Sequence, residues 1–218
     1  KTQKIDEAIA IKQQQIALLQ ERQQILIQNA VTGKIIWSEK EQKTIPLAQS
    51  GVASKDSGVS WIGEIPEHWD VSRLGLILSP YSIKNHPNER LLSVTRELGV
   101  IERDLEDLEL NHNFIPEDLS NYKLIKKGDF AMNKMKAWQG SYGISKFRGI
   151  ISPAYYTFRI IDTINPDFFH LAIRSKVYVP FFGQASDGIR IGQWDLSKER
   201  MKMIPFIVPS LKEQNEIL

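Results

Sequence analysis

Residues 2–30 read TQKIDEAIAIKQQQIALLQERQQILIQNA, and this stretch contains neither glycine nor proline. Its commonest residues are Gln, Ile, Leu, Lys and Glu, all of which tolerate or favour a helix. The sequence therefore predicts one long helix within residues 1–32. We expect it to end near Asn29, because Thr32 and Gly33 supply the signal that typically follows a helix C-terminus.

The apolar residues of this predicted helix recur at heptad spacing. With Thr2 at position a, six of the nine a and d positions are apolar, and Lys12 and Gln23 interrupt the pattern. This pattern is typical of a coiled-coil seam, which binds a partner helix. The residues of the predicted seam are Ile5, Ile9, Ile16, Leu19 and Leu26. We expect it to self-associate, giving a homodimer with a two-fold axis.

A second apolar stripe, Ile11, Leu18 and Ile25, follows another face of the same helix. A helix with two stripes needs two neighbours, or one neighbour and its own domain. The alternative to a coiled coil is an ordinary helix packed within a globular fold, and the spacing alone leaves both open.

Residues 33–60 are interpreted as a linker. They mix charges with small and turn-forming residues and show no sustained periodicity, although a short strand over residues 34–37 fits the pattern. Because structureless loops this long are uncommon inside compact domains, we expect a domain boundary here.

From Trp61 to Pro209, short β-like runs alternate with turn signals. This pattern predicts a β-rich domain over residues 61–209, and hence an α+β chain. One helix is predicted over residues 166–175, where Pro166 suits the first helical position. The predicted strands are residues 69–74, 90–95, 123–125, 130–136, 141–144, 154–161 and 203–208.

Residues 210–218 predict the start of a second helix. Ser210 is a favourable N-cap, and Glu213 lies three residues further on, which is the spacing of a capping box.

Composition excludes several classes of protein. The 218 residues are 42% hydrophobic and 25% charged, which is typical of a folded globular protein. No apolar run is long enough to span a bilayer, and no secretory signal follows Lys1. The sequence contains no cysteine, which excludes disulfides, cysteine-bound metal and thiol catalysis and fits a reducing compartment. We therefore expect a cytoplasmic protein without membrane contact.

The net charge of +2 conceals two blocks of opposite sign. Residues 97–118 hold eight acids and one base, whereas residues 120–160 hold eight bases and one acid. Basic segments that also contain aromatic residues suit a polyanion, because Lys and Arg displace counterions from phosphates. The alternative is two solvated faces whose charges pair with each other.

Motifs for catalysis are absent from the sequence. It contains no phosphate-binding GxxxxGK[ST] loop, no GxGxxG, no HExxH and no GxSxG, and its four histidines lack metal-ligand spacing. Asp195 and Glu199 are interpreted as parts of a short helical turn. We therefore expect no enzyme activity and no cofactor.

Several stretches share the pattern of one known family, in the same order along the chain. They are KTQKIDEAI (1–9), QQILIQNAVT (23–32), DSGVSWIGEIPEHW (56–69), LLSVT (91–95), KGDFAMNKM (127–135), GIISPAY (149–155), GQWD (192–195) and PSLKEQ (209–214). Together they resemble the specificity (S) subunit of type I restriction–modification systems. The family usually carries two target-recognition domains and two long helices, of which this chain matches one domain, one helix and the start of the second.

The resemblance implies a non-catalytic subunit that reads double-stranded DNA. Each recognition domain in the family reads one half of a split target, and the helices act as a spacer that docks the methyltransferase (M) subunits. Methylation and cleavage belong to partner chains, so the restriction (R) subunit is an indirect partner. The alternative is a protein–protein interaction module built on the amphipathic helix, without DNA readout.

Within this resemblance, two segments supply most of the candidate DNA contacts. Residues 134–143 and 186–194 combine basic, amide, hydroxyl and aromatic side chains around glycines. Lysine binds phosphate or guanine, arginine does the same, and glutamine reads adenine through two hydrogen bonds. The predicted DNA-binding residues are Lys134, Lys136, Gln139, Ser141, Tyr142, Arg190, Gln193, Thr95 and Arg96.

Structural roles compete with these assignments. Trp138 and Tyr142 could pack inward, and Arg190 could pair with Asp187 instead of DNA. Four further residues are expected to form a packed structural cluster rather than a stacking platform. They are Trp61, Ile65, Pro66 and Trp69.

Overall fold

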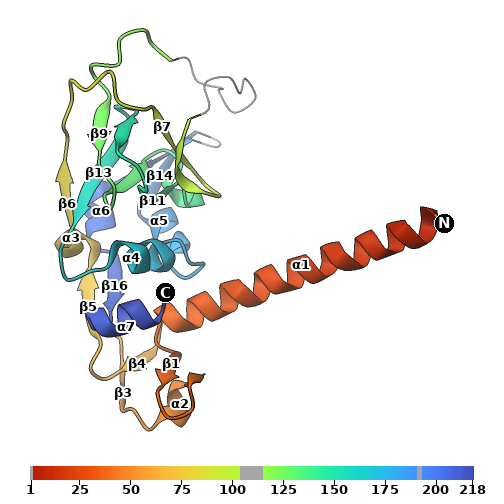
Figure 1. Ribbon diagram of the computed structural model, residues 1–218. Coiled ribbons are helices and arrows are strands. Elements are labelled where there is room, and N and C mark those ends of the chain that lie inside the picture. The colour runs from red at the N-terminus through yellow and green to blue at the C-terminus, as the bar shows by residue number, and fades with distance from the viewer. Residues whose placement is uncertain (1, 104–114, 191–192) are drawn as a thin grey trace. The chain divides into compact units, whose positions relative to one another are not determined.

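The computed structural model describes residues 2–103, 115–190 and 193–218 (Figure 1). Contacts within the chain divide it into two units, Lys1–Glu67 and His68–Leu218. A long N-terminal helix is followed by a strand-rich region of small sheets, which confirms the α+β prediction. Among the described residues, no helix combines the length and apolar content that crossing a membrane requires. Half of the acidic block, residues 104–114, lies outside the described residues.

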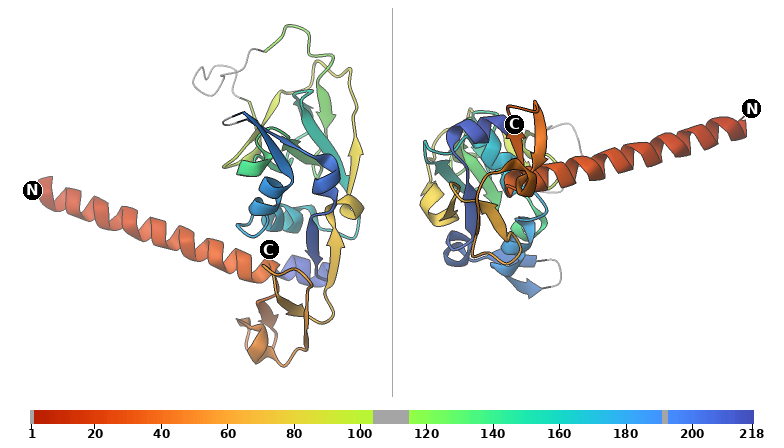
Figure 2. Two further views of the ribbon diagram at one scale, coloured as in Figure 1. Left: turned by 180° about the vertical axis from the view of Figure 1, so that it is seen from behind. Right: turned by 90° about the horizontal axis from the view of Figure 1, so that it is seen from below.

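The first unit begins with helix α1 (Thr2–Val31), which is continuous in every view (Figures 1 and 2). Gly33 follows it in a left-handed conformation with φ of 69°. The amides of Gly33 and Lys34 donate to the carbonyls of Ala30 (3.1 Å) and Asn29 (2.8 Å). Glycine adopts positive φ without a side-chain clash, so the predicted stop signal ends the helix as expected.

Residues 33–60, interpreted from the sequence as a linker, are folded. Strands β1 (Ile35–Ser38) and β2 (Lys43–Pro46) pair as one antiparallel hairpin, with α2 (Leu47–Ser50) after it. Strands β3 (Ser54–Asp56) and β4 (Glu64–Pro66) pair as another. The sequence did not predict most of these strands because three or four residues are too few to show an alternation of apolar and polar side chains.

Burial of a few side chains explains why this segment folds. Ile45, Leu47, Ile62 and Ile65 are each less than a tenth exposed, so both hairpins contribute to a small core. Of the four residues that the sequence predicts as a packed cluster, Ile65, Pro66 and Trp69 are buried, whereas Trp61 is 53% exposed. The contact boundary falls between Glu67 and His68, later than the boundary expected from the sequence.

The second unit is built on a four-stranded antiparallel sheet in the order β11-β10-β13-β6. Aromatic rings fill one side of it: Phe130 on β10 meets Phe169 edge-on at 5.2 Å, and Phe169 lies 5.0 Å from Phe206. The strands are β6 (Leu78–Tyr81), β10 (Phe130–Asn133), β11 (Tyr142–Ile144) and β13 (Tyr155–Ile160).

Four two-stranded antiparallel pairs surround this sheet. They are β5 (Asp70–Arg73) with β16 (Pro205–Val208), β7 (Leu92–Thr95) with β8 (Gly99–Glu102), β9 (Lys123–Ile125) with β12 (Gly149–Ile151), and β14 (Ser186–Arg190) with β15 (Gln193–Leu196). All seven predicted strands overlap observed ones.

Helices of the second unit are short. They are α3 (Leu74–Ile77), the 3₁₀ turn η1 (Ala137–Gln139), α4 (Pro166–Ile173), α5 (Val179–Gln184), α6 (Lys198–Lys202) and α7 (Leu211–Glu216). Helix α4 confirms the helix predicted after Asn165, whose side chain accepts hydrogen bonds from the amides of Asp167 (2.8 Å) and Phe168 (3.4 Å). Glu199 lies in the first turn of α6, as expected, but Asp195 lies on strand β15 and Ser197 is the N-cap of the helix.

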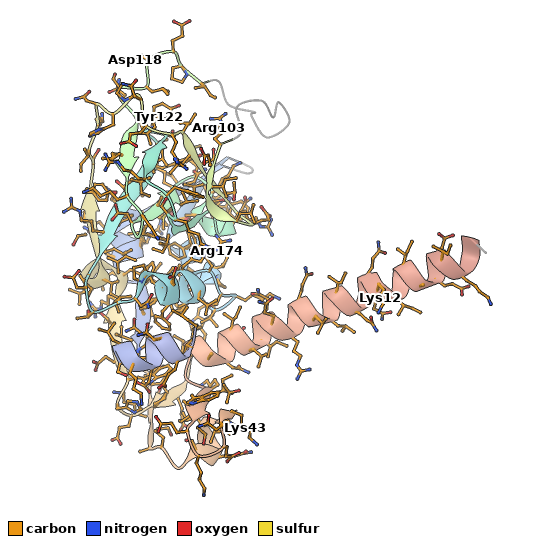
Figure 3. The ribbon with its side chains drawn as sticks, in the orientation of Figure 1. Lys12, Lys43, Arg103, Asp118, Tyr122 and Arg174 are labelled. Carbon is orange, nitrogen blue, oxygen red and sulfur yellow. The ribbon has the colours of Figure 1, made fainter. Side chains whose placement is uncertain are left out.

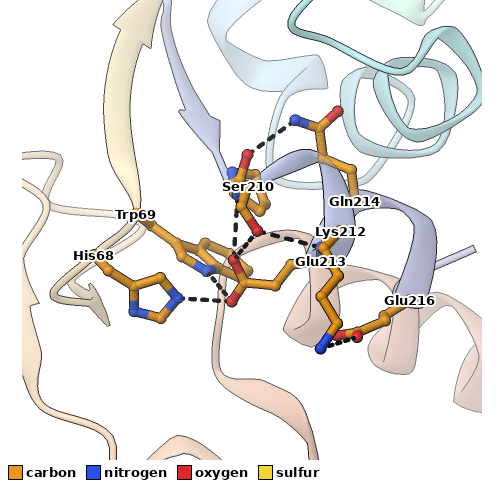
Figure 4. A network of polar contacts seen from close by, with 8 residues as sticks. His68, Trp69, Ser210, Lys212, Glu213, Gln214 and Glu216 are labelled. Atoms are coloured by element: carbon orange, nitrogen blue, oxygen red, sulfur yellow. Dashed lines mark hydrogen bonds and ion pairs between the residues drawn. The ribbon is translucent and has the colours of Figure 1, made fainter.

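The predicted capping box opens α7, and it also ties this helix to the start of the unit (Figure 4). The Glu213 carboxylate accepts from the Trp69 indole (2.8 Å) and contacts His68 at 2.7 Å. Burial alone would raise the pKa of Glu213, but hydrogen bonds from Trp69, Ser210 and His68 lower it. Gln214 is fully buried, and its side chain binds the Asn165 amide at 2.7 Å. Helix α7 is therefore fixed to the body of the second unit.

Candidate nucleic-acid interface

The segment after β10 forms a tight loop that carries three of the predicted DNA contacts. Backbone hydrogen bonds close it, from the Gln139 amide to the Lys136 carbonyl (3.1 Å) and from Gly140 to Ala137 (2.9 Å). Gly140 has φ of 90°, which only glycine adopts readily. Lys136 is exposed, while Lys134 and Gln139 are half-buried. These three side chains remain candidates for contact with a ligand.

Ser141 and Tyr142 were predicted as DNA contacts, and their burial contradicts this. Tyr142 is fully buried and Ser141 is 2% exposed. The Tyr142 hydroxyl donates to the Ile173 carbonyl (3.2 Å), and its ring lies 4.4 Å from that of Phe182. Burial also raises the pKa of this hydroxyl. The segment enters β11 at this point, so the aromatic ring belongs to the core.

The hairpin β14–β15 lies against the same loop. The Trp194 ring stacks on Trp138 with centroids 5.3 Å apart, and Lys134 Nζ lies 3.1 Å from the Asp195 carboxylate. The Leu196 amide also donates to the Lys134 carbonyl (3.2 Å). The two segments that the sequence singled out separately therefore form one surface.

Arg190 and Gln193 face each other in register on this hairpin. Their side chains lie outside the described part of the structure, so their roles stay predictions. Asp187, the expected partner that would compete with DNA for Arg190, forms an ion pair with Arg200.

Thr95 and Arg96 lie at the turn between β7 and β8. The Thr95 hydroxyl donates to the Gly99 carbonyl (3.1 Å) and accepts from the Leu98 amide (3.2 Å), so it closes the turn. Arg96 is exposed, and its guanidinium lies 3.6 Å from the Glu97 carboxylate. Of these two predicted residues, Arg96 is exposed, whereas Thr95 is half-buried and its hydroxyl is engaged within the turn.

A cluster of lysines, which we call the lysine surface, gathers at the start of β13. Lys123 donates to the Tyr155 carbonyl, and Lys198 Nζ lies 4.5 Å from the centre of the Tyr156 ring. Lys134 directly follows the residue that pairs with Tyr155 in the sheet. The lysine surface consists of Lys84, Lys123, Lys134 and Lys198.

The charges of the lysine surface act on one another. Burial lowers the pKa of Lys123 first, and the positive charges of Lys198, Lys84 and Lys134 lower it further. Among the described residues, the Asp195 carboxylate is the one acid that forms an ion pair with this surface. An anion such as phosphate would relieve the repulsion. Sequence reasoning missed Lys84 and Lys198, because they lie far from the basic block and come together only in the fold.

The predicted seam of α1 is uncovered in this chain. Its residues are between 47% and 65% exposed, and the second stripe is exposed to the same degree. The exposed residues are Ile5, Ile9, Ile16, Leu19 and Leu26 on the seam and Ile11, Leu18 and Ile25 on the second stripe. Apolar surface of this extent on one helix is typical of a protein contact.

Metal-binding geometry does not accompany this surface in the part of the chain that the structure describes. Within the ranges that the structure describes, no group of three or more His, Asp or Glu side chains is placed to hold a metal ion. The class that emerges is an α+β protein with a long exposed helix and a strand-rich unit bearing a basic surface.

Its structure is similar to those of specificity subunits of type I restriction–modification systems. The HsdS subunit from Thermoanaerobacter tengcongensis aligns over 97% of this chain and 46% of its own, with 14% identity and a TM-score of 0.48. A chain from work on complex assembly and conformational transition of the type I R-M system aligns over 97% and 47%, with 13% identity and a TM-score of 0.46. The chain thus spans about half the length of each. No protein-family model and no curated protein matches it.

Proposed function

We propose that this chain is a non-catalytic DNA reader that recognises one half of a bipartite target for a type I restriction–modification complex. The observation that supports the proposal is the contact of the 134–139 loop with Trp194 and Asp195 of the β14–β15 hairpin, beside the lysine surface. Each segment was singled out from the sequence for its mixture of basic and amide side chains. Their convergence supports a single face for duplex DNA on the second unit.

The side chains of this face divide into two kinds of contact. Lys84, Lys123 and Lys198 suit the phosphate backbone, which fixes the position of the protein without reading bases. Gln139, Lys136, Arg190, Gln193 and Arg96 suit base edges in the major groove, where glutamine pairs with adenine and arginine with guanine. The lysines therefore supply affinity for DNA, and the loops supply the preference for one sequence.

Titration of fluorescent duplex DNA tests the lysines directly. We expect Lys84→Gln/Lys198→Gln to weaken binding on every sequence and to reduce the log–log salt slope by about 2, because each lysine releases about one counterion. The matched control is Lys40→Gln/Lys176→Gln, which removes the same charge from exposed residues elsewhere. An equal loss of DNA affinity in the two double variants would show that net charge alone explains the effect. That result would count against the proposed face.

Selection from a pool of duplexes with a randomised segment tests the reading function. We expect the full chain, alone or with a methyltransferase partner, to enrich one short sequence. Binding without enrichment, or binding that does not depend on salt, would remove sequence-specific recognition from the proposal.

The exposed stripes of α1 support a second function, which is docking of a partner. We propose that the seam binds a methyltransferase subunit or the equivalent helix of a second copy. Ile16→Glu/Leu19→Glu places two charges on the seam, and sedimentation of wild type and variant measures the result. We expect wild-type association, with itself or with the methyltransferase subunit, and its loss in the variant. An equal effect from Gln13→Glu/Gln20→Glu, which adds the same two charges off the seam, would show charge rather than the seam to be responsible.

A further inference from the structure

Arg174 binds four backbone carbonyls with its two terminal nitrogens. Nη1 donates to the carbonyls of Tyr142 (2.6 Å) and Gly140 (3.3 Å), and Nη2 donates to those of Arg96 (2.8 Å) and Glu97 (2.7 Å). These acceptors belong to two separate parts of the chain, the loop that leads into β11 and the turn between β7 and β8. One side chain therefore holds both in place. Figure 3 labels Arg174 beside helix α4.

The base from which Arg174 extends is rigid. It directly follows α4, which is capped by Asn165 at its start and buries Phe168, Phe169, Ala172 and Ile173 in the core. One turn earlier on the same helix, the His170 Nδ1 accepts a hydrogen bond from the Ile144 amide (3.0 Å). Arg174 and His170 thus bind backbone groups of β11 at two points.

Strand β11 lies at the edge of the four-stranded sheet, where backbone groups lack a neighbouring strand. On the open side of β11, the Tyr142 carbonyl accepts a hydrogen bond from Arg174, and the Ile144 amide donates one to His170. The side chains of α4 therefore take the place that another strand would occupy.

Two glycines bring the β7–β8 hairpin close to this edge. A Cβ atom at Gly143 would lie 3.0 Å from His170 Cε1 and 3.2 Å from Gly99 Cα. Gly99 itself has φ of 73°, which completes the turn after Leu98. The hairpin and β11 are thus in backbone contact, and the four hydrogen bonds of Arg174 span their junction.

We propose that Arg174 is a positioning residue for DNA recognition: it sets the distance between the turn that carries Arg96 and the loop that carries Lys136 and Gln139. This inference rests on the proposed function. The four hydrogens of its terminal nitrogens are engaged by carbonyls, so Arg174 acts through these segments and not on DNA. A planar fork is needed to reach two pairs of acceptors, and the point charge of lysine cannot reproduce it.

The test compares wild type with Arg174→Lys on two duplexes. One carries the sequence that wild type selects from the randomised pool, and the other is its scrambled version. We expect the preference for the selected sequence to fall about tenfold, the scale of one base contact, with binding to the scrambled duplex unchanged. The matched control is Lys176→Ala, an exposed cation two residues further on, which should leave the preference intact.

Three results overturn the inference. Arg174→Lys could keep the wild-type preference, it could lose affinity equally on both duplexes, or Lys176→Ala could reproduce its effect. If the wild-type chain selects no sequence, the proposed function itself is wrong, and this result is distinct from the three above.

Amide hydrogen exchange supplies a readout that does not depend on DNA. In Arg174→Lys we expect faster exchange in residues 95–99 and 139–144, with the central strands β10 and β13 as protected as in wild type. Arg174→Gln, which keeps fewer donors and no charge, should extend the same change. Faster exchange throughout the unit would show a general loss of stability and remove the positioning role.

Discussion

The hairpins β7–β8 and β14–β15 both lie against the 134–142 segment, yet they are attached to the second unit in different ways. Leu92, Val94 and Val100 of the first hairpin are buried in a cluster with residues of β9, β10 and β12. The second hairpin is attached by the stacked rings of Trp194 and Trp138 and by ion pairs of partly exposed side chains.

This difference indicates that the two hairpins respond differently to their surroundings. Burial of apolar side chains depends little on salt, whereas ion pairs between exposed groups are screened by it. The turn of the first hairpin is also bound by Arg174, which fixes it in place. We therefore expect the second hairpin to adjust to a ligand more readily than the first. Four perturbations test this comparison, in decreasing order of their expected effect.

Truncation in the first hairpin should have the largest effect on stability. Leu92 is 2% exposed, so Leu92→Ala leaves a cavity and should lower the free energy of unfolding by about 2–4 kcal/mol. Leu98 lies in the turn of the same hairpin and is 68% exposed, so Leu98→Ala should change it by less than about 0.5 kcal/mol. Urea unfolding measures the change in the free energy of unfolding for each variant. Similar losses in the two variants would show that the hairpin is not part of the core.

Acid should weaken the attachment of β11 through His170. Burial lowers the pKa of His170 to about 4, the charges of Arg174 and Lys146 lower it too, and Asp167 opposes them. The unfolded chain binds this proton near pH 6.5 and the folded chain does not, so stability is present above pH 6.5 and falls toward pH 4.

The loss through His170 should reach about 2 kcal/mol at pH 4.5, after allowance for partial exposure of the ring. Carboxylates titrate over the same range, and His170→Gln, which stays neutral, separates their contribution. Urea unfolding of both chains from pH 7 to 4.5 should show a steeper decline for wild type. Parallel curves would mean that protonation of His170 does not oppose folding.

Removal of the tryptophan stack should affect mainly the second hairpin. Trp194→Ala removes the ring that covers Trp138, and a stacked pair contributes about 0.5–1.5 kcal/mol beyond burial. We expect faster amide exchange in β14 and β15 with β7 and β8 unchanged. Loss of protection in both hairpins would show that they are one cooperative structure and contradict the comparison.

Local signals explain which parts of the fold the sequence predicted. Three local signals each depend on residues a few positions apart, and all three are observed. They are the end of α1 just before Gly33, the N-terminus of α4 at Pro166 and the capping box of α7. The strands that prediction missed are short, and β6 also contains Pro80, which is tolerated because β6 lies at the sheet edge.

Long-range contacts explain what the sequence could not supply for the candidate site. The residue types indicated segments 134–143 and 186–194 as candidates for DNA contact. They did not indicate that Tyr142 enters the core while Lys136 stays exposed. Lys84 and Lys198 join the lysine surface only through the fold of β9, β13 and α6. Arg174 belongs to no motif, and its importance comes entirely from carbonyls of distant segments.

The smallest effect on stability is expected from the ion pair between Lys134 and Asp195. Their charged groups are 3.1 Å apart, but the side chains are 31% and 42% exposed, so Asp195→Asn should cost only about 0.5 kcal/mol. The same change removes the one described carboxylate paired with the lysine surface. It should therefore strengthen binding to scrambled duplex DNA about two- to fivefold at low salt, and the gain should disappear as salt screens it.

Glu199→Gln is the matched control, because this carboxylate pairs with Lys202 on α6 and is 81% exposed. It should leave DNA binding close to wild type. If Asp195→Asn instead weakens binding to the selected sequence alone, the Asp195 carboxylate accepts a hydrogen bond from a base, as carboxylates do from the amino group of cytosine. In that case the second hairpin reads DNA with Asp195 as well as with its predicted residues, and Lys134 serves to hold that carboxylate in place.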